Sequence, residues 1–280
     1  MTSTRVAVVS GSNKGIGIGI VRGLCKLFDG VVYLTARNVE LGARAVASLK
    51  QELTNSEAAK LQFHQLDITD VSSVAKLKEH LVAKYGGLDV LVNNAGIAFK
   101  VSSTAPFGEQ AAVTAATNYY GTKTVCDHLF PLLRPHARVV NVCSRAGVIG
   151  GGYGSSVRSA LTDPALTVAQ LDQLVDHFIQ YAKQGTHTQH GYPNSAYGFS
   201  KAAEIALTDI QHRQLSSVDR ADIVINSCCP GYVDTDMTSH KGRLTIDQGA
   251  DTPLYLALLP ANVPEPRGKF IAERKAISKS

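Results

Sequence analysis

The sequence predicts a single α/β domain built on a doubly wound, open sheet of parallel strands. Its apolar β-branched runs do not alternate with polar residues, which is typical of strands buried on both faces. These runs alternate with helical patterns, and that succession joins parallel neighbours in a sheet. No internal repeat or low-complexity linker divides the 280 residues. We therefore expect one domain over residues 1–280.

The expected elements follow one another from the N-terminus. The predicted strands are RVAVVS (5–10), VVYLTA (31–36), LQFHQLDI (61–68), LDVLVNNAG (88–96), ARVVNVCS (137–144) and ADIVINSCC (221–229). The predicted helices between the first four strands cover residues 17–28, 40–53 and 72–85, and one long helix precedes the fifth strand. This order places helices on both faces of the sheet.

About fifty residues, 145–194, interrupt this alternation. They begin with the glycine-rich GVIGGGYG and contain a helical pattern whose apolar face is formed by Val168, Leu171, Leu174, Val175, Phe178, Ile179 and Ala182. Thr167 and Gln170 are spaced as a capping box at its start. The segment is predicted to be a packed helical insertion beside the site that the sheet forms.

Composition excludes several classes of protein. The chain is 44% hydrophobic and 18% charged, as in a soluble globular domain. The net charge of +5 comes from dispersed lysines and arginines, which disfavours nucleic-acid binding. The first residues lack a secretory leader pattern, and no apolar run is long enough to span a bilayer. Five cysteines without Cys-x-x-Cys spacing favour reduced thiols in the cytoplasm.

A glycine-rich turn follows the first strand and opens the first helix. In SGSNKGIG (10–17), glycines at 11, 15 and 17 allow the backbone to approach a pyrophosphate, which the free N–H groups of the helix start attract. Arg37 ends the second strand where an NAD site would have an acidic residue, and Lys14 adds a second cation. Both favour a 2′-phosphate, so NADP(H) is the expected cofactor.

Two stretches have the spacing Tyr-x-x-x-Lys: Tyr197 with Lys201, and Tyr119 with Lys123. Reduction of a ketone needs an acid beside the carbonyl oxygen. An ammonium about 5 Å away, at an effective dielectric of about 20, favours tyrosinate by roughly 3 kcal/mol, or about two pKa units. Ser144 ends the fifth strand, at the edge where such sheets bind ligands. This selects Tyr197, and we expect the Tyr119 pair to pack against neighbouring elements.

The motifs, in their order, resemble those of the short-chain dehydrogenase/reductase family with its Rossmann-type sheet, and of its monomeric NADPH-dependent carbonyl reductases in particular. The matching stretches are NKGIG, LTAR, FHQLDI, YGGLDVLVNNAGIAFKV, VVNVCS, SAYG and CCPGYVDTDM, and the similarity extends from about Arg5 to about Phe270. The long insertion before SAYG belongs to the same subgroup. Glu40, Leu41 and Asp234 depart from the residues that similar reductases often have, and they weaken the expected NADP preference.

The resemblance implies roles for individual residues. Ser144 would bind the carbonyl oxygen, Tyr197 would donate the proton, Lys201 would assist Tyr197 and contact the nicotinamide ribose, and Asn118 would hold a relay water. The implied cofactor-binding residues are Gly11, Ser12, Asn13, Lys14, Gly15, Ile16, Gly17, Arg37, Asp67, Ile68, Asn94, Ala95, Gly96, Tyr197, Lys201, Pro230, Gly231, Val233, Asp234 and Thr235. Asp67 and Ile68 would flank the adenine.

The expected substrate side combines resemblance with position in the chain. In similar reductases the residues matching Phe99, Lys100, Val101 and Gln110 line a site for glutathione or its conjugates. Cys228 is expected to border the pocket and Tyr232 to form an aromatic wall, beside Ser144 and Tyr197. His187 and His190 lack a carboxylate or cysteine partner at ligand spacing, so no metal is expected.

The sequence thus predicts an NADPH-dependent reductase of ketones, aldehydes and quinones, and of glutathione adducts. Two alternatives remain open at this point: a hydroxysteroid or prostaglandin dehydrogenase that acts oxidatively, and a catalytically idle NADP-sensing protein. The expected partners are small carbonyl compounds and glutathione, without nucleic acid or membrane. The inserted helix is expected to cover the helices through which many relatives form tetramers, so a monomer is predicted.

Overall fold

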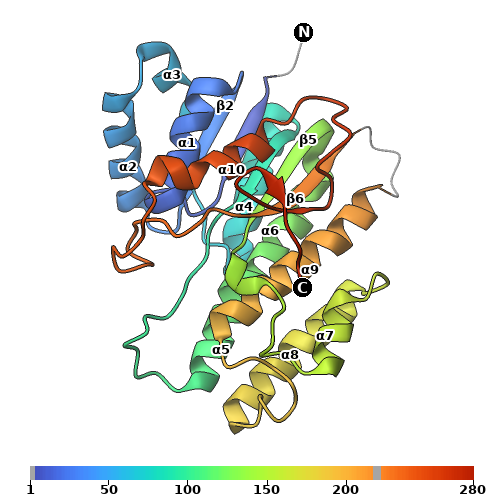
Figure 1. The fold of residues 1–280 in the computed structure, drawn as a ribbon. Coiled ribbons are helices and arrows are strands. Elements are labelled where there is room, and N and C mark those ends of the chain that lie inside the picture. The colour runs from blue at the N-terminus through green and yellow to red at the C-terminus, as the bar shows by residue number, and fades with distance from the viewer. Residues whose placement is uncertain (1–3, 217–221) are drawn as a thin grey trace.

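A computed structural model describes residues 4–216 and 222–280 and contains one eight-stranded sheet (Figure 1). The strand order is β3-β2-β1-β4-β5-β6-β7-β8. The strands are β1 (Val6–Val9), β2 (Val31–Ala36), β3 (Leu61–Gln65), β4 (Leu88–Asn93), β5 (Leu133–Val142), β6 (Val224–Cys229), β7 (Phe270–Ala272) and β8 (Lys275–Ala276). The first seven run parallel and β8 pairs antiparallel with β7. The predicted sheet is confirmed.

Helices cover both faces of the sheet. The longer ones are α1 (Gly15–Leu27), α2 (Val39–Glu52), α4 (Val71–Tyr85), α5 (Phe107–Ala115), α6 (Thr122–Leu129), α8 (Val168–Gln184), α9 (Ala196–Ser216) and α10 (Ile246–Ala257). The shorter ones are α3 (Asn55–Lys60), α7 (Ser155–Thr162), the π-helix η1 (Ala116–Gly121), and the 3₁₀ turns η2 (Phe130–Leu132) and η3 (Arg145–Gly147). On one face, α1 and α10 lie side by side.

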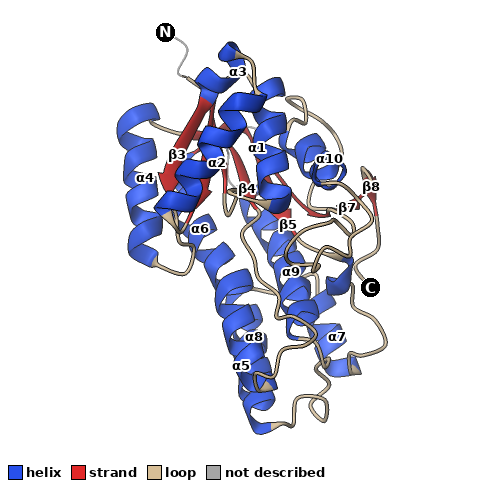
Figure 2. Ribbon diagram, turned by 90° about the vertical axis from the view of Figure 1, so that its left-hand side faces the viewer, coloured by secondary structure: helices blue, strands red, loops and turns tan. Residues whose placement is uncertain are grey.

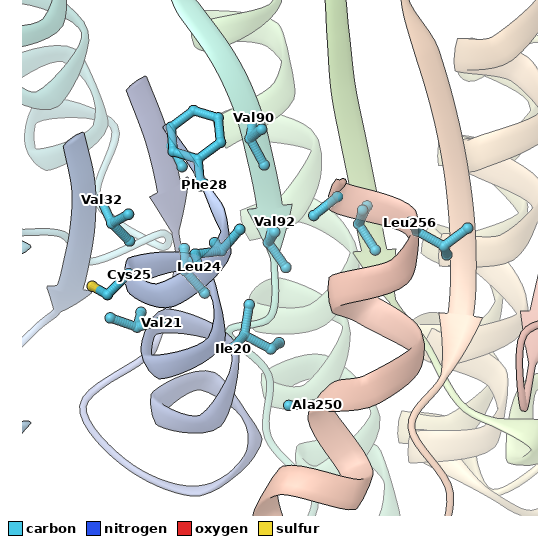
Figure 3. Packing of buried hydrophobic residues seen from close by; sticks show 14 of the residues in the cluster. Ile20, Val21, Leu24, Cys25, Phe28, Val32, Val90, Val92, Ala250 and Leu256 are labelled. Atoms are coloured by element: carbon cyan, nitrogen blue, oxygen red, sulfur yellow. The ribbon is translucent and has the colours of Figure 1, made fainter. Parts of the chain in front are cut away.

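Both faces of each central strand are buried, which explains the absence of alternation in the sequence. In β1, Ala7 and Val9 pack into the core beneath α1, α2 and α10, whereas Val6 and Val8 pack beneath α4 and α6. Figure 3 shows the first of these cores, in which side chains of α1 and α10 meet those of β2 and β4. The sheet is therefore a rigid support for the loops at its edge.

The inserted segment folds as a packed unit, as predicted. Helix α8 packs against α5 and α9, and Figure 2 shows α5 and α8 extending together beyond the sheet. The capping box between Thr167 and Gln170 is present. Phe178 is buried against Phe199 of α9, with ring centroids 4.3 Å apart. The packing of α8 against α5 and α9 therefore extends the layer of helices beside the predicted site.

Tyr119 fixes α8 to the body of the domain. It is fully buried, and its hydroxyl donates a hydrogen bond of 2.8 Å to Asp172 of α8. Lys123 lies 3.7 Å from the same carboxylate and 3.4 Å from Asp127. The prediction that this Tyr-Lys pair packs against neighbouring elements is confirmed. Its role is structural.

Several elements were not predicted from the sequence. The long helix expected before β5 is divided into α5, η1 and α6, and α7 precedes α8 in the insertion. Helix α10 and the last two strands follow β6, at which the predicted sheet ended. Strands β7 and β8 contain three and two residues, too few for a period of two to be visible.

Candidate active site

The loops that carry the predicted site residues meet at the carboxyl edge of the sheet. The glycine loop follows β1, Asn94 follows β4, Ser144 follows β5 and Pro230 follows β6. Such an edge collects side chains that lie far apart in the sequence. Helix α9 then brings Tyr197 and Lys201 to the end of β5, where Lys201 contacts the carbonyl of Val142.

The glycine loop has the geometry of an anion site. Gly11 and Gly15 have φ of +58° and +57°, a region that favours glycine. A Cβ on Gly17 would lie 2.6 Å from both Ser12 Cα and Asn94 Nδ2. Helix α1 begins here with no side-chain cap and no acidic residue in its first turn, so its N–H groups are free for a pyrophosphate.

Two predicted cofactor residues hold the loop in shape with their side chains. The hydroxyl of Ser12 donates to the carbonyl of Val9 and accepts from the amide of Thr35. The Asn94 amide donates to the carbonyls of Ser10 and Gly11, at 3.0 Å each. Both side chains therefore shape the cofactor cradle, and Ala95 lies against Gly11 at its floor.

The two cations expected to select a 2′-phosphate differ in their surroundings. Arg37 is exposed at the end of β2, and no carboxylate pairs with it among residues 4–216 and 222–280. Lys14 forms an exposed ion pair of 2.6 Å with Asp236, a residue that His240 also contacts. Arg37 is thus available to an anion, whereas Lys14 must exchange a protein carboxylate for it.

Other predicted cofactor residues lie around this cradle. Asp67 follows β3, but its carboxylate already accepts bonds from the amide and hydroxyl of Thr69. Ile68 is buried against Gly121. Thr235 lies against Gly15, and the side chain of Val233 is buried against Gly249. Of the other residues in the predicted set, Asn13 and Ile16 are partly buried in the loop and the first turn of α1. Asp234 is exposed and lies 2.8 Å from His240 Nδ1.

The predicted catalytic side chains lie together at the start of α9. The Lys201 ammonium is 5.9 Å from the centre of the Tyr197 ring, and it donates to the Val142 carbonyl at 3.0 Å. Ser144 lies near enough to Tyr197 to lower the pKa of its phenol. Its Oγ also accepts from the amide of Ala146, which orients the side chain. A carbonyl oxygen placed between Ser144 and Tyr197 would meet two hydroxyl donors.

Burial changes the acidity expected for Tyr197. Burial raises the pKa of Tyr197, while Lys201 and the hydrogen bond with Ser144 lower it and Glu204 raises it further. The net direction is upward, because burial outweighs the lowering effect of Lys201 that is expected from the sequence. A tyrosine with a raised pKa is protonated at neutral pH, and this is the form that donates a proton.

Asn118 lies in the π-helix η1, and its side chain is fully engaged. Its Oδ1 accepts from the Ile97 amide, and its Nδ2 donates to the Ile97 carbonyl and to Ser200 Oγ. These bonds join the loop after β4 to α9. A Cβ on Gly96 would lie 3.3 Å from Asn118 Oδ1 and 3.5 Å from Lys201 Nζ, so this loop passes close to both.

A cavity of about 270 Å³ opens beside Tyr197. It is lined by the predicted substrate residues Phe99, Lys100, Val101 and Gln110, together with Tyr197, Phe107, Ser103, Thr114, Asn194, Ser195 and Ala196. A second cavity, of about 340 Å³, lies between α9 and the C-terminal residues 277–280 and contains none of the predicted site residues. The structure therefore gathers four of the expected substrate residues, Phe99, Lys100, Val101 and Gln110, beside the expected acid.

Two predicted substrate residues lie elsewhere. Cys228 is fully buried in β6 and packs into the core beneath α1 and α10, and burial raises the pKa of its thiol. It is neither at the cavity nor activated, so its prediction as a substrate contact is corrected. Tyr232 is half exposed on the loop after Gly231, outside the cavity lining. Cys143, beside Ser144, is buried in a small core with Ile205 and Phe270.

The two histidines of the insertion belong to its packing. His187 stacks on Phe107 at 4.3 Å, and His190 stacks on Tyr181 at 3.7 Å. Within the part of the chain that the structure describes, no group of three or more His, Cys, Asp or Glu side chains is placed to hold a metal ion. In the same residues, no helix is both long and apolar enough to cross a membrane.

Sequence reasoning missed three functional neighbours. Glu204 pairs with Lys201 at 2.7 Å, Asp236 pairs with Lys14, and Asn194 lines the cavity. The spacing of Glu204, three residues after Lys201 on one helix face, was a visible signal. The contact of Asp236 spans 222 residues and had no local signal.

Comparison with known proteins decides the family. The short chain dehydrogenase model matches residues 5–159. The chain belongs to the short-chain dehydrogenase/reductase family. Among relatives in this family, carbonyl reductase (NADPH) 1 of Macaca fascicularis is 45% identical, over 97% of each chain. Carbonyl reductase (NADPH) 3 of Mus musculus is 44% identical, over 97% of each chain. Of solved structures, salutaridine reductase of Papaver somniferum matches with a TM-score of 0.85 and 31% identity, over 95% of this chain and 99% of that one.

Proposed function

We propose that the protein is an NADPH-dependent carbonyl reductase that converts ketones, aldehydes and quinones to alcohols or hydroquinones. One observation carries the proposal: Tyr197, with Ser144 and Lys201 beside it, lies on the wall of the cavity lined by Phe99 and Val101. Relatives that are 44–45% identical over nearly their whole length are carbonyl reductases. The proposed site thus combines a proton donor with a pocket that has both apolar and polar walls.

The cofactor cradle supports NADPH. The loop glycines and the uncapped start of α1 would hold the pyrophosphate, and Arg37 would pair with the 2′-phosphate. NADPH, when bound, supplies the hydride. Glu40 pairs with Arg44 on the exposed side of α2, at 3.8 Å, and so does not neutralise Arg37. Glu40, which is expected from the sequence to weaken the preference for NADP, therefore pairs with Arg44 rather than with Arg37.

The chain's own residues would control the proton. Ser144 and Tyr197 would orient the carbonyl by hydrogen bonds to its oxygen, which takes on negative charge as the carbon receives the hydride. Tyr197 then donates its proton to that oxygen, and the products are the alcohol and tyrosinate. Lys201 would stabilise the tyrosinate until a proton from solvent restores the phenol. With a raised pKa, Tyr197 is protonated at neutral pH, as donation to the substrate requires.

The substrate range follows from the cavity lining. Its volume of about 270 Å³ and its Phe99, Phe107 and Val101 suit a compact apolar or aromatic carbonyl compound. Lys100 lies on the rim, where its ammonium donates to Ser239 Oγ at 3.2 Å. In the proposal that glutathione adducts are substrates, Lys100 would leave Ser239 and pair with a glutathione carboxylate. The oxidative alternative uses the same residues and has no separate observation in its favour.

Steady-state assays test this proposal. We expect reduction of menadione and of an aliphatic ketone with NADPH, and rates at least tenfold lower with NADH at equal concentration, because Arg37 has no phosphate to bind. A glutathione adduct of an unsaturated aldehyde should compete if Lys100 contributes. No carbonyl-dependent oxidation of NADPH with any of the three would contradict the proposal and favour the catalytically idle alternative.

We also propose a monomer in the cytoplasm. Helix α8 covers α5 and α9 with a face that includes Leu171, Val175 and Phe178, and so occupies a helix surface that could otherwise pair with a second copy. The five cysteines are buried and free, which suits a reducing compartment. Light scattering should give the mass of one chain, 29.8 kDa. A stable dimer or tetramer at micromolar concentration would contradict this.

A further inference from the structure

A carboxylate lies buried directly behind the proposed catalytic lysine. Glu204 follows Lys201 by one turn of α9, its side chain is 1% exposed, and its Oε2 is 2.7 Å from Lys201 Nζ. Carboxylates are rarely buried so completely, because leaving water is costly for a charge. Lys201 already has a partner in the Val142 carbonyl. The mechanism described so far does not need this acid.

The surroundings of Glu204 connect it to the proton donor. The titratable groups that face it are Lys201 and Tyr197 of α9, Cys126 of α6 and Cys143 after β5. The hydroxyl of Thr122, at the start of α6, also bonds to its carboxyl. Within the described chain, Oε2 has no hydrogen-bond partner and only the ammonium as a counter-ion. The acid is therefore placed to act on the lysine and, through it, on the tyrosine.

The contacts of Lys201 show how Glu204 can act on Tyr197 through the lysine. An ammonium has three N–H groups; one points to the Val142 carbonyl, one contact goes to Glu204, and one remains for the ribose or the tyrosine. Burial alone would lower the pKa of Lys201, but Glu204 and Tyr197 raise it and the net direction is upward. Burial raises the pKa of Glu204, which Lys201 opposes. In the alkaline range where a phenol titrates, a carboxyl beside an ammonium is ionised.

We propose that Glu204 is a positioning residue that holds the Lys201 ammonium and, as a fixed negative charge, weakens its pull on the Tyr197 phenol, so that the tyrosine keeps its proton at higher pH. The inference rests on the proposed function, in which Tyr197 is the acid. Glu204 touches neither substrate nor cofactor in this account. It acts by setting the pH range over which reduction proceeds.

The test is the pH dependence of kcat/KM for reduction of cyclohexanone with saturating NADPH. In the wild type, the alkaline fall in kcat/KM reports ionisation of Tyr197. In Glu204→Gln the amide can stay in contact with Lys201 but carries no charge. The fall should therefore begin about one pH unit lower, since at an effective dielectric of about 20 such a charge moves the pKa of a phenol by about that amount. In Glu204→Leu the fall should shift in the same direction, with a further loss in kcat because Lys201 loses a contact.

Asp209→Asn is the matched control. Asp209 is also on α9 and forms an ion pair with a lysine, Lys279, away from Tyr197. Its substitution should leave the profile in place. An unmoved profile in Glu204→Gln, a shift to higher pH, or an equal shift in Asp209→Asn would each overturn the inference. If Glu204→Gln does not fold, as judged by loss of NADPH binding in a fluorescence assay, Glu204→Leu provides the test through the same shift in the pH profile. Apolar replacement of a buried ion is often tolerated.

The proposed function fails separately from this inference. If Tyr197→Phe still reduces cyclohexanone at the wild-type rate, the assignment of the acid is wrong and the profile has another source. If Tyr197→Phe is inactive and the Glu204→Gln profile does not move, the acid stands and only the role of Glu204 is lost.

Discussion

Replacement of Tyr197 by phenylalanine should lower kcat for carbonyl reduction by about 10³-fold, within the range of 10²–10⁴ that general acid catalysis contributes. The hydroxyl that is lost is the group that would donate the proton, and Lys201 lies 5.9 Å from the centre of the ring that carries it. The KM for NADPH should change little, because the ring and Lys201 remain. The measurement is steady-state reduction of menadione, with NADPH binding followed by fluorescence.

Tyr119→Phe is the matched control, because it is the same chemical change in the other Tyr-x-x-x-Lys stretch. Its kcat should stay within about twofold of the wild type. The lost bond to Asp172 should instead lower the free energy of unfolding by about 1.5–3 kcal/mol, the range of a hydrogen bond to a charged group. Urea denaturation measures this cost. Equal losses of kcat in the two variants would contradict the assignment of Tyr197.

Substitution of Arg37 by alanine should have the second largest effect on the kinetics, and only when NADPH is the cofactor. A charge-assisted bond is worth about 1.5–3 kcal/mol, so the KM for NADPH should rise about 10–100-fold. The KM for NADH should not change, because that cofactor has no 2′-phosphate for Arg37 to bind. The measurement is kcat/KM with each cofactor at fixed menadione.

Arg44→Ala controls for loss of a positive charge on the same surface. Arg44 is exposed on α2 and pairs with Glu40, so its removal should leave both cofactors unaffected. Equal effects of the two substitutions would mean that general surface charge, rather than Arg37, selects NADPH. Equal losses with NADPH and NADH in Arg37→Ala would mean that this residue supports the fold of the loop instead.

Much of the fold could be predicted from the sequence because burial leaves a clear pattern. Strands buried on both faces, such as β1 and β4, are continuous apolar runs, and the apolar face of α8 repeats with the helix period. The glycine loop was predicted because positive φ and close approach require glycine at Gly11, Gly15 and Gly17. Once the sheet is taken to be parallel, the order of Ser144, Tyr197 and Lys201 along the chain is enough to predict that they lie together.

The remainder depended on contacts that no local pattern encodes. Whether the pKa of Tyr197 lies above or below its ordinary value depends on the burial of Tyr197 and on Glu204, and both are three-dimensional facts. Helical periodicity could not show that a π-helix interrupts the helix at Asn118. Cys228 was placed at the pocket from its position in the chain, yet its side chain points into the core.

The most direct test of the account is transfer of deuterium from NADPH deuterated at both positions of nicotinamide C4 to an aliphatic ketone. If the protein reduces carbonyl compounds by hydride transfer with Tyr197 as the acid, mass spectrometry should find one deuterium on the alcohol carbon with the wild type, and almost no alcohol with Tyr197→Phe. Alcohol without deuterium, or equal deuterated product from the two proteins, would contradict it.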